Sequence, residues 1–219
     1  MLIDIHAHHL VDNLDQIQFL DDRDFVGLHP WFINPLTYTE DFKLVSKRHR
    51  ENNIAFIGET GLDKLKSPVD FDLQKKVFLD HLKLAIELKR PLVIHCLKAH
   101  NEFLEILKAE NFQGKFLIHD YSGSEKEMQR YLQYDAYFSF GRSLFREQSK
   151  AQMVFKKTPI DRIFLETDDD KNITIKQVYD QAKLLLKRDD LEAQVLKNFL
   201  LFFNYTYDIR PANFPKNIC

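Results

Sequence analysis

The sequence predicts an α/β fold, and three observations support this prediction. Short apolar runs of strand length alternate with longer segments whose apolar residues recur at helical spacing, which is typical of repeated β-α units and a mostly parallel sheet. The 19 Phe residues and an apolar fraction of 44% indicate a well-filled globular interior. The chain contains no internal repeat, low-complexity tract or Gly/Ser-rich linker, so we expect residues 1–219 to form a single domain.

Seven strands are predicted from the apolar runs, and the position of an eighth stays open. The seven are Leu2–His6, Phe25–Leu28, Ile54–Gly58, Leu92–His95, Lys115–His119, Ala136–Phe140 and Arg162–Glu166. Parallel strands in this number, separated by helices, predict a compact, TIM-like (β/α) barrel of seven or eight strands. At 219 residues, such a barrel has little room for additional layers.

Helices are predicted between the strands from apolar residues that recur along one stripe. In Phe71–Lys89 the stripe consists of Phe71, Phe78, Leu82, Ala85 and Ile86. Pro91 stops this helix just before the next strand. Six further helices are predicted at Thr39–Glu51, Asn101–Ala109, Ser124–Tyr134, Arg146–Lys156, Thr174–Lys187 and Leu191–Tyr205. The last of these is the most apolar, so we expect it to pack tightly against the strands.

The overall charge and the cysteine content limit the classes of function. The formal net charge is −2 and the isoelectric point is about 6.5, so no overall positive field would attract a polyanion. A phosphate-bearing substrate would have to be attracted locally, by metal ions or by a few basic residues. The chain starts without a basic-then-apolar leader, and no segment reaches the roughly 18 apolar residues of a membrane span. We therefore expect a cytoplasmic protein in which Cys96 and Cys219 are free thiols.

Two histidines stand at alternate positions at the end of the first predicted strand, in Asp4-Ile5-His6-Ala7-His8. Side chains two residues apart on a strand point to the same face, so His6 and His8 can present two imidazoles to one ion. Neutral imidazole is a common ligand for zinc and other first-row metals. Because a His-x-His pair also arises in surface strands, this motif alone leaves both interpretations open.

Further side chains of the metal-binding type recur at the ends of other predicted strands: Glu59, His95, His119 and Asp168. In a β/α barrel these strand ends converge on one rim, where residues of different strands meet. We therefore expect them to share one space with the two histidines of the first strand. Each also has an ordinary structural alternative, as a loop acid, a hydrogen-bonded core histidine or a helix cap.

In their order along the chain, these motifs resemble those of the TatD-type metal-dependent deoxyribonucleases, a family within the amidohydrolase superfamily. The resemblance covers nearly the whole chain, at 4–8, 27–30, 57–63, 91–95, 118–123, 139–141 and 162–168. Asn198, in the last predicted helix, matches the family as well. Several independent matches in the same order are far more specific than any single motif.

The resemblance implies a site for two divalent metal ions. Its six ligands would be His6, His8 and Asp168 for one ion, His95 and His119 for the other, and Glu59 as the bridge between them. Asp168 would also act as the base for the attacking water. Two such ions can polarise a phosphoryl oxygen and stabilise the leaving oxygen. A mixed set of histidines and carboxylates suits zinc or manganese better than magnesium.

Other residues are candidates for contacts with the substrate. His29, which precedes Pro30, matches a family position that lines the substrate pocket, although it is equally well explained as a loop histidine. Arg142 and Arg146 are candidates for phosphate contacts, and a solvated helix start is the alternative. Trp31 either stacks on a base or belongs to the core.

Several nearby residues are expected to support the site or to lie away from it. We expect Asp4 to orient ligands and Asp63 to support the Glu59 loop. Cys96 should point away from the site, because it neighbours the inward-facing His95. The remaining histidines are expected to be surface or packing residues: His9, His49, His81 and His100.

The sequence departs from the family pattern where the substrate would bind. Leu97, followed by Lys98, stands where the family usually has an arginine suited to phosphate. After Asp168, the segment 169–172 replaces a small residue and a proline, and its two carboxylates would repel a polyanion unless they bind cations or turn away. Asp120-Tyr121 stands where cysteine and phenylalanine are usual. The predicted metal site is complete, whereas the predicted substrate surface is not.

The sequence thus predicts a metal-dependent hydrolase that uses two divalent ions, zinc, manganese or magnesium, to activate water. The expected reaction is phosphodiester cleavage in DNA or short oligonucleotides, with no membrane partner. Two alternatives stay open. One is a hydrolase of a small phosphoester or an amide with the same binuclear site, since fold does not fix function. The other is a degenerate barrel without catalytic activity.

Overall fold

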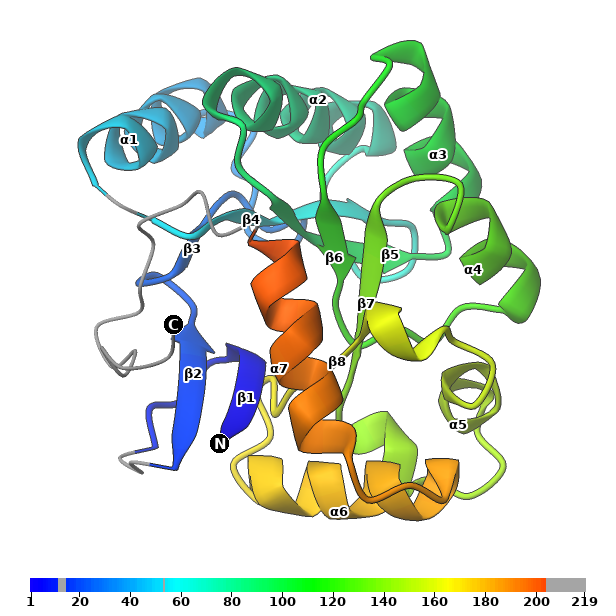
Figure 1. Ribbon diagram of the computed structural model, residues 1–219. Helices are drawn as coiled ribbons and strands as arrows, with labels where there is room; N and C mark the ends of the chain where they lie inside the picture. Colours follow the sequence, from blue (N-terminus) through cyan, green and yellow to red (C-terminus); the bar gives the residue numbers. More distant parts are fainter. Residues whose placement is uncertain (12–14, 53, 204–219) are drawn as a thin grey trace. The chain divides into compact units, whose positions relative to one another are not determined.

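Strands and helices alternate along most of the chain in the computed structural model, which describes residues 1–11, 15–52 and 54–203 (Figure 1). These residues form two compact units that interleave along the sequence. The first unit contains residues 1–21, 120–129 and 137 onward, and the second contains residues 22–119 and 130–136. Each unit therefore combines segments that are far apart in the sequence. The organisation as a single domain stays a prediction.

The second unit is built on parallel strands that pair in chain order. They are β3 (Phe25–Val26), β4 (Phe56–Asp63), β5 (Leu92–Leu97) and β6 (Phe116–Ile118). Three helices lie along one side of these strands: α1 (Tyr38–Glu51), α2 (Phe71–Leu88) and α3 (His100–Ala109) (Figure 1). All eight residues of β4 are buried. Because β4 includes polar side chains, their hydrogen-bonding groups must find partners inside the protein.

Helix α2 begins and ends where its sequence requires. The Asp70 carboxylate caps its first turn by accepting a hydrogen bond from the backbone N–H of Asp72, at 2.7 Å. At the other end Lys89 adopts a left-handed conformation, with φ of 51°, and Pro91 follows. Most of the predicted stripe is buried, but Ile86 is 45% exposed and was wrongly assigned to it. The helix therefore covers β4 through the rest of the stripe.

The first unit contains two pairs of parallel strands. One pair is β1 (Leu2–Ala7) with β2 (Gln16–Leu20), and the other is β7 (Ala136–Phe140) with β8 (Ile163–Leu165). An isolated parallel bridge between Ala7 and Asp168 joins the end of β1 to the segment that follows β8. The end of the first strand therefore pairs with the residues that directly follow the last strand.

Helices and aromatic side chains fill the core of the first unit. The helical segments there are α5 (Lys150–Phe155), α6 (Ile175–Leu186), α7 (Leu191–Phe202) and two 3-10 turns, Arg142–Phe145 and Ile160–Arg162. The Phe202 ring of α7 lies 4.7 Å from the Tyr137 ring and 5.6 Å from the Phe164 ring, measured between centroids. The Asn198 amide donates to the carbonyls of Ile160 and Ile163, at 2.8 Å each. The expected tight packing of the last helix is confirmed.

The predicted elements are largely those of the structure, with local differences. The eighth strand is β2, whose buried Gln16 and Gln18 interrupt the apolar pattern that marks the other strands. Strand β4 continues to Asp63, so Glu59 lies within a strand and not after it. The helix predicted from Arg146 begins only at Lys150, because a 3-10 turn precedes it and the Ser149 hydroxyl caps it. The predicted end of the last helix, Tyr205, lies outside the described residues.

The remaining helix, α4 (Glu125–Tyr131), is short. None of the helices in the described ranges has the length and apolar character that crossing a bilayer requires.

Candidate metal centre

A first cluster of predicted ligands lies in the first unit, where β1 ends beside the segment after β8. His6 is fully buried, and its Nδ1 lies 3.7 Å from Asp168 Oδ1. His8 Nε2 lies 3.3 Å from the same oxygen. The structure therefore brings together the three residues predicted to hold one ion: His6, His8 and Asp168. We call them the β1 cluster.

Backbone hydrogen bonds fix Asp168 against β1. Its N–H donates to the His6 carbonyl at 3.0 Å, and its own carbonyl accepts from the His8 N–H at 3.0 Å. Asp168 has φ of 53°, a left-handed conformation that is uncommon for residues other than glycine. The bonds on both sides hold the backbone in this conformation and direct the carboxylate toward the two imidazoles.

Asp4 holds the residue that precedes Asp168. Its Oδ1 accepts from the Thr167 N–H at 3.0 Å, and its Oδ2 accepts from the Thr167 hydroxyl at 2.8 Å and from the Gln18 amide at 3.2 Å. Burial raises the pKa of the Asp4 carboxyl to about 7, although the bonds from Thr167 and Gln18 act in the opposite direction. Asp4 therefore orients the loop that carries Asp168 rather than binding a ligand histidine directly.

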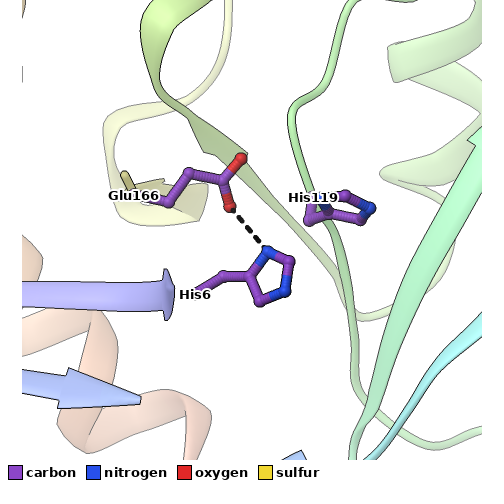
Figure 2. Close-up of side chains that lie close together, drawn as sticks. All are labelled: His6, His119 and Glu166. Carbon is purple, nitrogen blue, oxygen red and sulfur yellow. Dashed lines mark ion pairs between the residues drawn. The ribbon is translucent and has the colours of Figure 1, made fainter. Parts of the chain in front are cut away.

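Glu166 is a further carboxylate beside the β1 cluster that the predicted ligand set did not include. Figure 2 shows its ion pair with His6, in which Oε2 lies 3.7 Å from Nδ1. The other oxygen, Oε1, accepts from the Asp120 N–H at 2.6 Å, and the residue is fully buried. The signal in the sequence was a glutamate directly after an apolar strand, two positions before Asp168.

A second cluster lies in the second unit, along β4, β5 and the residue after β6. His119 Nε2 lies 2.9 Å from Glu59 Oε2 and 3.3 Å from His95 Nδ1. These three predicted ligands, Glu59, His95 and His119, are called the β4 cluster. His29 joins them, since its Nε2 lies 3.7 Å from Glu59 Oε2 and its ring centroid 4.5 Å from that of His95. Glu59, His29 and His95 each offer a ligand atom within 4.8 Å of the others.

A glycine allows β4 to approach β5 at the β4 cluster. Gly61 pairs with His95 in the parallel register. A Cβ atom at Gly61 would lie 2.0 Å from the His95 carbonyl oxygen, and the φ of Gly61 is 143°. Only glycine combines that backbone conformation with such a close approach. The glycine next to Thr60 is therefore part of what places His95 opposite β4.

Asp63 orients His95 from the end of β4. Its Oδ2 lies 3.0 Å from His95 Nε2 and accepts from the Trp31 indole N–H at 2.6 Å, while Oδ1 accepts from the N–H groups of Leu65 and Lys66. Burial would raise the pKa of this carboxyl, but these bonds outweigh burial and lower it to about 2. Asp63 thus supports both the loop and a ligand, and Trp31 binds the carboxylate.

Burial favours the neutral form of His29 and His95 in the second unit. Burial lowers the pKa of His29 to about 4, against the opposing influence of Glu59. The pKa of His95 is also lowered, mainly by burial and to a smaller extent by the nearby His119. Neutral imidazoles have a lone pair available, which a metal ion requires.

His81, expected to be a surface or packing residue, is buried in α2 and fixes the backbone before His29. Its Nε2 accepts from the Leu28 N–H at 3.0 Å, and its Nδ1 lies 2.7 Å from the Val77 carbonyl. Because Nε2 accepts, Nδ1 carries the proton and donates to Val77. Burial lowers the pKa of His81 to about 4. This supporting role had no signal in the sequence beyond a histidine within an amphipathic helix.

Cys96 faces away from the ligands, as the alternation along β5 predicts. Its Sγ lies 3.4 Å from Nδ1 of His100 in α3 and 3.7 Å from the Tyr131 hydroxyl, and it forms no disulfide within residues 1–11, 15–52 and 54–203. Cys219 lies outside the described residues.

The predicted phosphate contact at Arg142 is mostly exposed and already paired. Its side chain is 75% exposed, and Nη1 lies 3.3 Å from Asp170 Oδ2. Asp170 is one of the two extra carboxylates after Asp168, and its side chain is only 5% exposed. Part of the expected repulsion toward a polyanion is therefore neutralised within the protein. The other arginine, Arg146, is exposed.

A cavity of about 310 Å³ adjoins Asp168 in the first unit. Its lining combines polar and apolar side chains: Asp4, His9, Val11, Gln16, Thr167, Asp168, Asp170, Lys171, Ile173, Thr174 and Ile175. This volume lies at the lower end of the range that small-molecule sites occupy, roughly 300–1,000 Å³.

Comparison with known proteins gives a consistent result. The family described as TatD related DNase matches residues 3–204. An uncharacterised metal-dependent hydrolase of Buchnera aphidicola is 35% identical over 144 residues, which are 65% of this chain and 54% of that protein. The human 3'-5' RNA nuclease TATDN2 is 34% identical over 65% of this chain and 19% of its own length. The chain thus spans about half of the first relative and a fifth of the second.

A solved structure supports the fold. The crystal structure of YjjV, a TatD homologue from Escherichia coli, has a TM-score of 0.72 and 21% sequence identity, over 88% of this chain and 78% of that one. This likeness concerns the fold alone, and it confirms the predicted α/β fold class.

Proposed function

Because the chain belongs to the family of TatD-related DNases, we propose that it is a metal-dependent hydrolase that cleaves phosphodiester bonds. The observation that carries the proposal is the β1 cluster, in which one Asp168 oxygen lies 3.7 Å from His6 and 3.3 Å from His8. Two imidazoles and a carboxylate at this spacing form a donor set suited to zinc or manganese.

We propose that each cluster binds one divalent ion. His6, His8 and Asp168 would hold the ion of the first unit. His95, His119 and Glu59 would hold the ion of the second unit, where burial favours the neutral form of His95. The role of Glu59 as a bridge between two ions stays a prediction, and His29 is a further candidate ligand in the second unit.

The side chains of the protein would contribute to the reaction in distinct ways. When bound, a divalent ion polarises a phosphoryl oxygen and makes a nucleophilic water available near neutral pH. Asp168, with a side chain that is 29% exposed, is reachable by solvent and would accept the proton of the attacking water. Asp4 would keep Asp168 in place through Thr167, and Asp63 would keep His95 in place.

The proposed substrate is DNA or a short oligonucleotide. The human relative is named an RNA nuclease, which supports a nucleic acid as the substrate class. Leu97 in place of an arginine, and the pairing of Arg142 with Asp170, leave few basic groups for a long phosphate backbone. Binding should therefore depend weakly on salt, because few counterions are released. A cytoplasmic location stays part of the proposal.

A small phosphoester is the second candidate, and the cavity beside Asp168 favours it. A volume of about 310 Å³ accommodates a group the size of a single nucleotide or smaller. Hydrolysis of such a substrate would use the same metal ligands.

Chelation and metal add-back test the proposal. The purified protein, stripped with a chelator and reloaded with Mn²⁺, Zn²⁺ or Mg²⁺, should cleave end-labelled single-stranded DNA, duplex DNA or RNA only when metal is present. A parallel assay with bis(p-nitrophenyl) phosphate and p-nitrophenyl phosphate separates diesters from monoesters. Metal binding without cleavage of any phosphodiester would refute the proposed reaction, and cleavage of the monoester alone would favour the second candidate.

A further inference from the structure

Glu166, like Asp4, is a fully buried carboxylate beside the β1 cluster, but one of its oxygens accepts no hydrogen bond from the described residues. The whole residue is inaccessible to solvent. Its Oε1 accepts one hydrogen bond, from the Asp120 N–H at 2.6 Å. Its Oε2 has no hydrogen-bond partner among the described residues, and lies 3.7 Å from His6 Nδ1. A buried carboxylate oxygen without a hydrogen bond is costly, so its position requires an explanation.

The distances from His6 to two carboxylate oxygens are close to those between ligands of one cation. Glu166 Oε2 and Asp168 Oδ1 each lie 3.7 Å from His6 Nδ1, and Asp168 Oδ1 lies 3.3 Å from His8 Nε2. Donor atoms that surround a tetrahedral ion at about 2.1 Å lie roughly 3.4 Å from one another. Three pairs among these four donor atoms therefore lie close to the spacing around a shared ion.

Charge supports the same assignment. Two carboxylates that face one buried imidazole repel each other unless a cation lies between them. Two neutral imidazoles with two carboxylates balance a divalent charge, whereas Asp168 alone would leave a net charge of +1 beside the fully buried His6.

The backbone holds Glu166 firmly enough for this role. A Cβ atom at Gly141 would lie 2.8 Å from the Glu166 carbonyl oxygen and 3.2 Å from its Cγ. Gly141 therefore leaves room for the glutamate to pack directly against the end of β7. With Oε1 held by Asp120, only Oε2 remains to contact an ion.

We infer that Glu166 Oε2 is an additional ligand of the cation bound by His6, His8 and Asp168. This inference rests on the proposed function for the presence of that cation. Its distinguishing consequence is a pair of opposite effects. Removal of the Glu166 charge should weaken metal binding, and should at the same time relieve the cost of a buried carboxylate in the metal-free protein.

The test compares the wild type with Glu166→Gln, which keeps an oxygen for the Asp120 N–H. Mn²⁺ binding to the chelator-stripped protein is titrated by calorimetry and by the electron paramagnetic resonance signal of free Mn²⁺. We expect the affinity of one site to fall at least tenfold in the variant. The Tm of the metal-free variant should equal or exceed that of the wild type, and its Mn²⁺-induced rise in Tm should be smaller. Glu147→Gln, an exposed glutamate on the same unit, is the matched control and should change neither quantity.

The outcomes separate the inference from the proposed function. If the wild type binds Mn²⁺ and the Gln variant binds it with the same affinity and stoichiometry, the inference fails and the proposed function stands. A lower Tm of the metal-free variant, or its failure to fold, would also overturn the inference, because Glu166 would then serve the fold. If the wild type binds no Mn²⁺, both fail.

Discussion

Asp4 and Thr167 are joined by two hydrogen bonds, one to the backbone N–H at 3.0 Å and one to the hydroxyl at 2.8 Å. Asp4 stands on the same strand as His6, His8 follows directly after the end of that strand, and Thr167 directly precedes Asp168. The Asp4 carboxylate thus sets the spacing between the end of β1, which carries the two imidazoles, and the loop that carries Asp168, a candidate ligand.

Thr167→Val removes the hydroxyl bond to Asp4 and keeps the shape of the side chain. We expect kcat to fall roughly tenfold, because a small displacement of Asp168 impairs its contact with water. Steady-state kinetics with the metal-loaded protein measures this effect. Thr158→Val removes a comparable buried hydroxyl bond, to the Val154 carbonyl, and should cost about 1 kcal/mol of stability without affecting kcat. Equal losses of kcat in both variants would contradict the assigned role of Asp4.

Asp168→Asn keeps the size of the side chain but removes its basic oxygen. We expect turnover to fall by at least about a hundredfold, while circular dichroism and Tm stay close to those of the wild type. Asp169→Asn changes the neighbouring exposed acid and should retain most of the activity. Near-normal turnover of the Asp168 variant would remove Asp168 from the mechanism.

Asp63→Asn should act on the metal of the second unit. The amide has a single acceptor oxygen, so it cannot replace both Oδ2, which bonds Trp31 and His95, and Oδ1, which accepts from two backbone N–H groups. The His95 ring would therefore lose its orientation. We expect Mn²⁺ affinity at one site to fall roughly 10- to 100-fold. Calorimetric titration of the stripped protein measures it. An unchanged affinity at both sites would show that His95 needs no such support.

Much of the fold could be predicted, and so could the side chains that the structure gathers as candidate metal ligands, because both depend on local patterns. Apolar runs mark buried parallel strands, and polar residues at the ends of those runs stood out, as His6, His95 and His119 did. Strand β2 was not predicted, because its buried Gln18 is polar and is accommodated by a hydrogen bond to Asp4 on another strand, which the local pattern does not reveal. The place of Glu166 beside the β1 cluster was not predicted for a similar reason, since its burial and its hydrogen bond from Asp120 arise only in the folded chain.

Stability of the metal-free protein should fall as the pH decreases from about 6.5 to 4, and His81 contributes to this fall. Its folded pKa is about 4, whereas the unfolded chain takes up a proton near 6.5. Between these values the unfolded state binds more protons, so acid favours unfolding, by roughly 3 kcal/mol for this group. Asp4, with a raised pKa, acts in the opposite direction over the same range, and His29 and His49 act with His81.

His81→Gln should therefore flatten the dependence of stability on pH. Urea unfolding of the chelated protein at pH values between 4 and 7 gives the slope. We expect the variant to be less sensitive to acid than the wild type even if its stability at pH 7 is lower. An identical slope for the two proteins would show that folding does not shift the pKa of His81.

Arg142 and Asp170 make a pair of opposite predictions. If Arg142 contacts phosphate, Arg142→Ala should raise KM for an oligonucleotide a few-fold and reduce the salt dependence by about one counterion, with kcat unchanged. Asp170→Asn should lower KM, because it releases the guanidinium from its 3.3 Å ion pair. KM values that move in the same direction in both variants would rule out this role for Arg142.

The amide of Asn198 has a consequence for how far the chain can be shortened. It anchors α7 to the carbonyl oxygens of Ile160 and Ile163, on either side of the entry into β8. Glu166 and Asp168 follow directly after that strand. A protein truncated before α7 would lose the hydrogen bonds from Asn198 to these two carbonyls, and the start of β8 would be held less firmly. Deletion of α7 should therefore impair the proposed metal site, as would replacement of one of its proposed ligands.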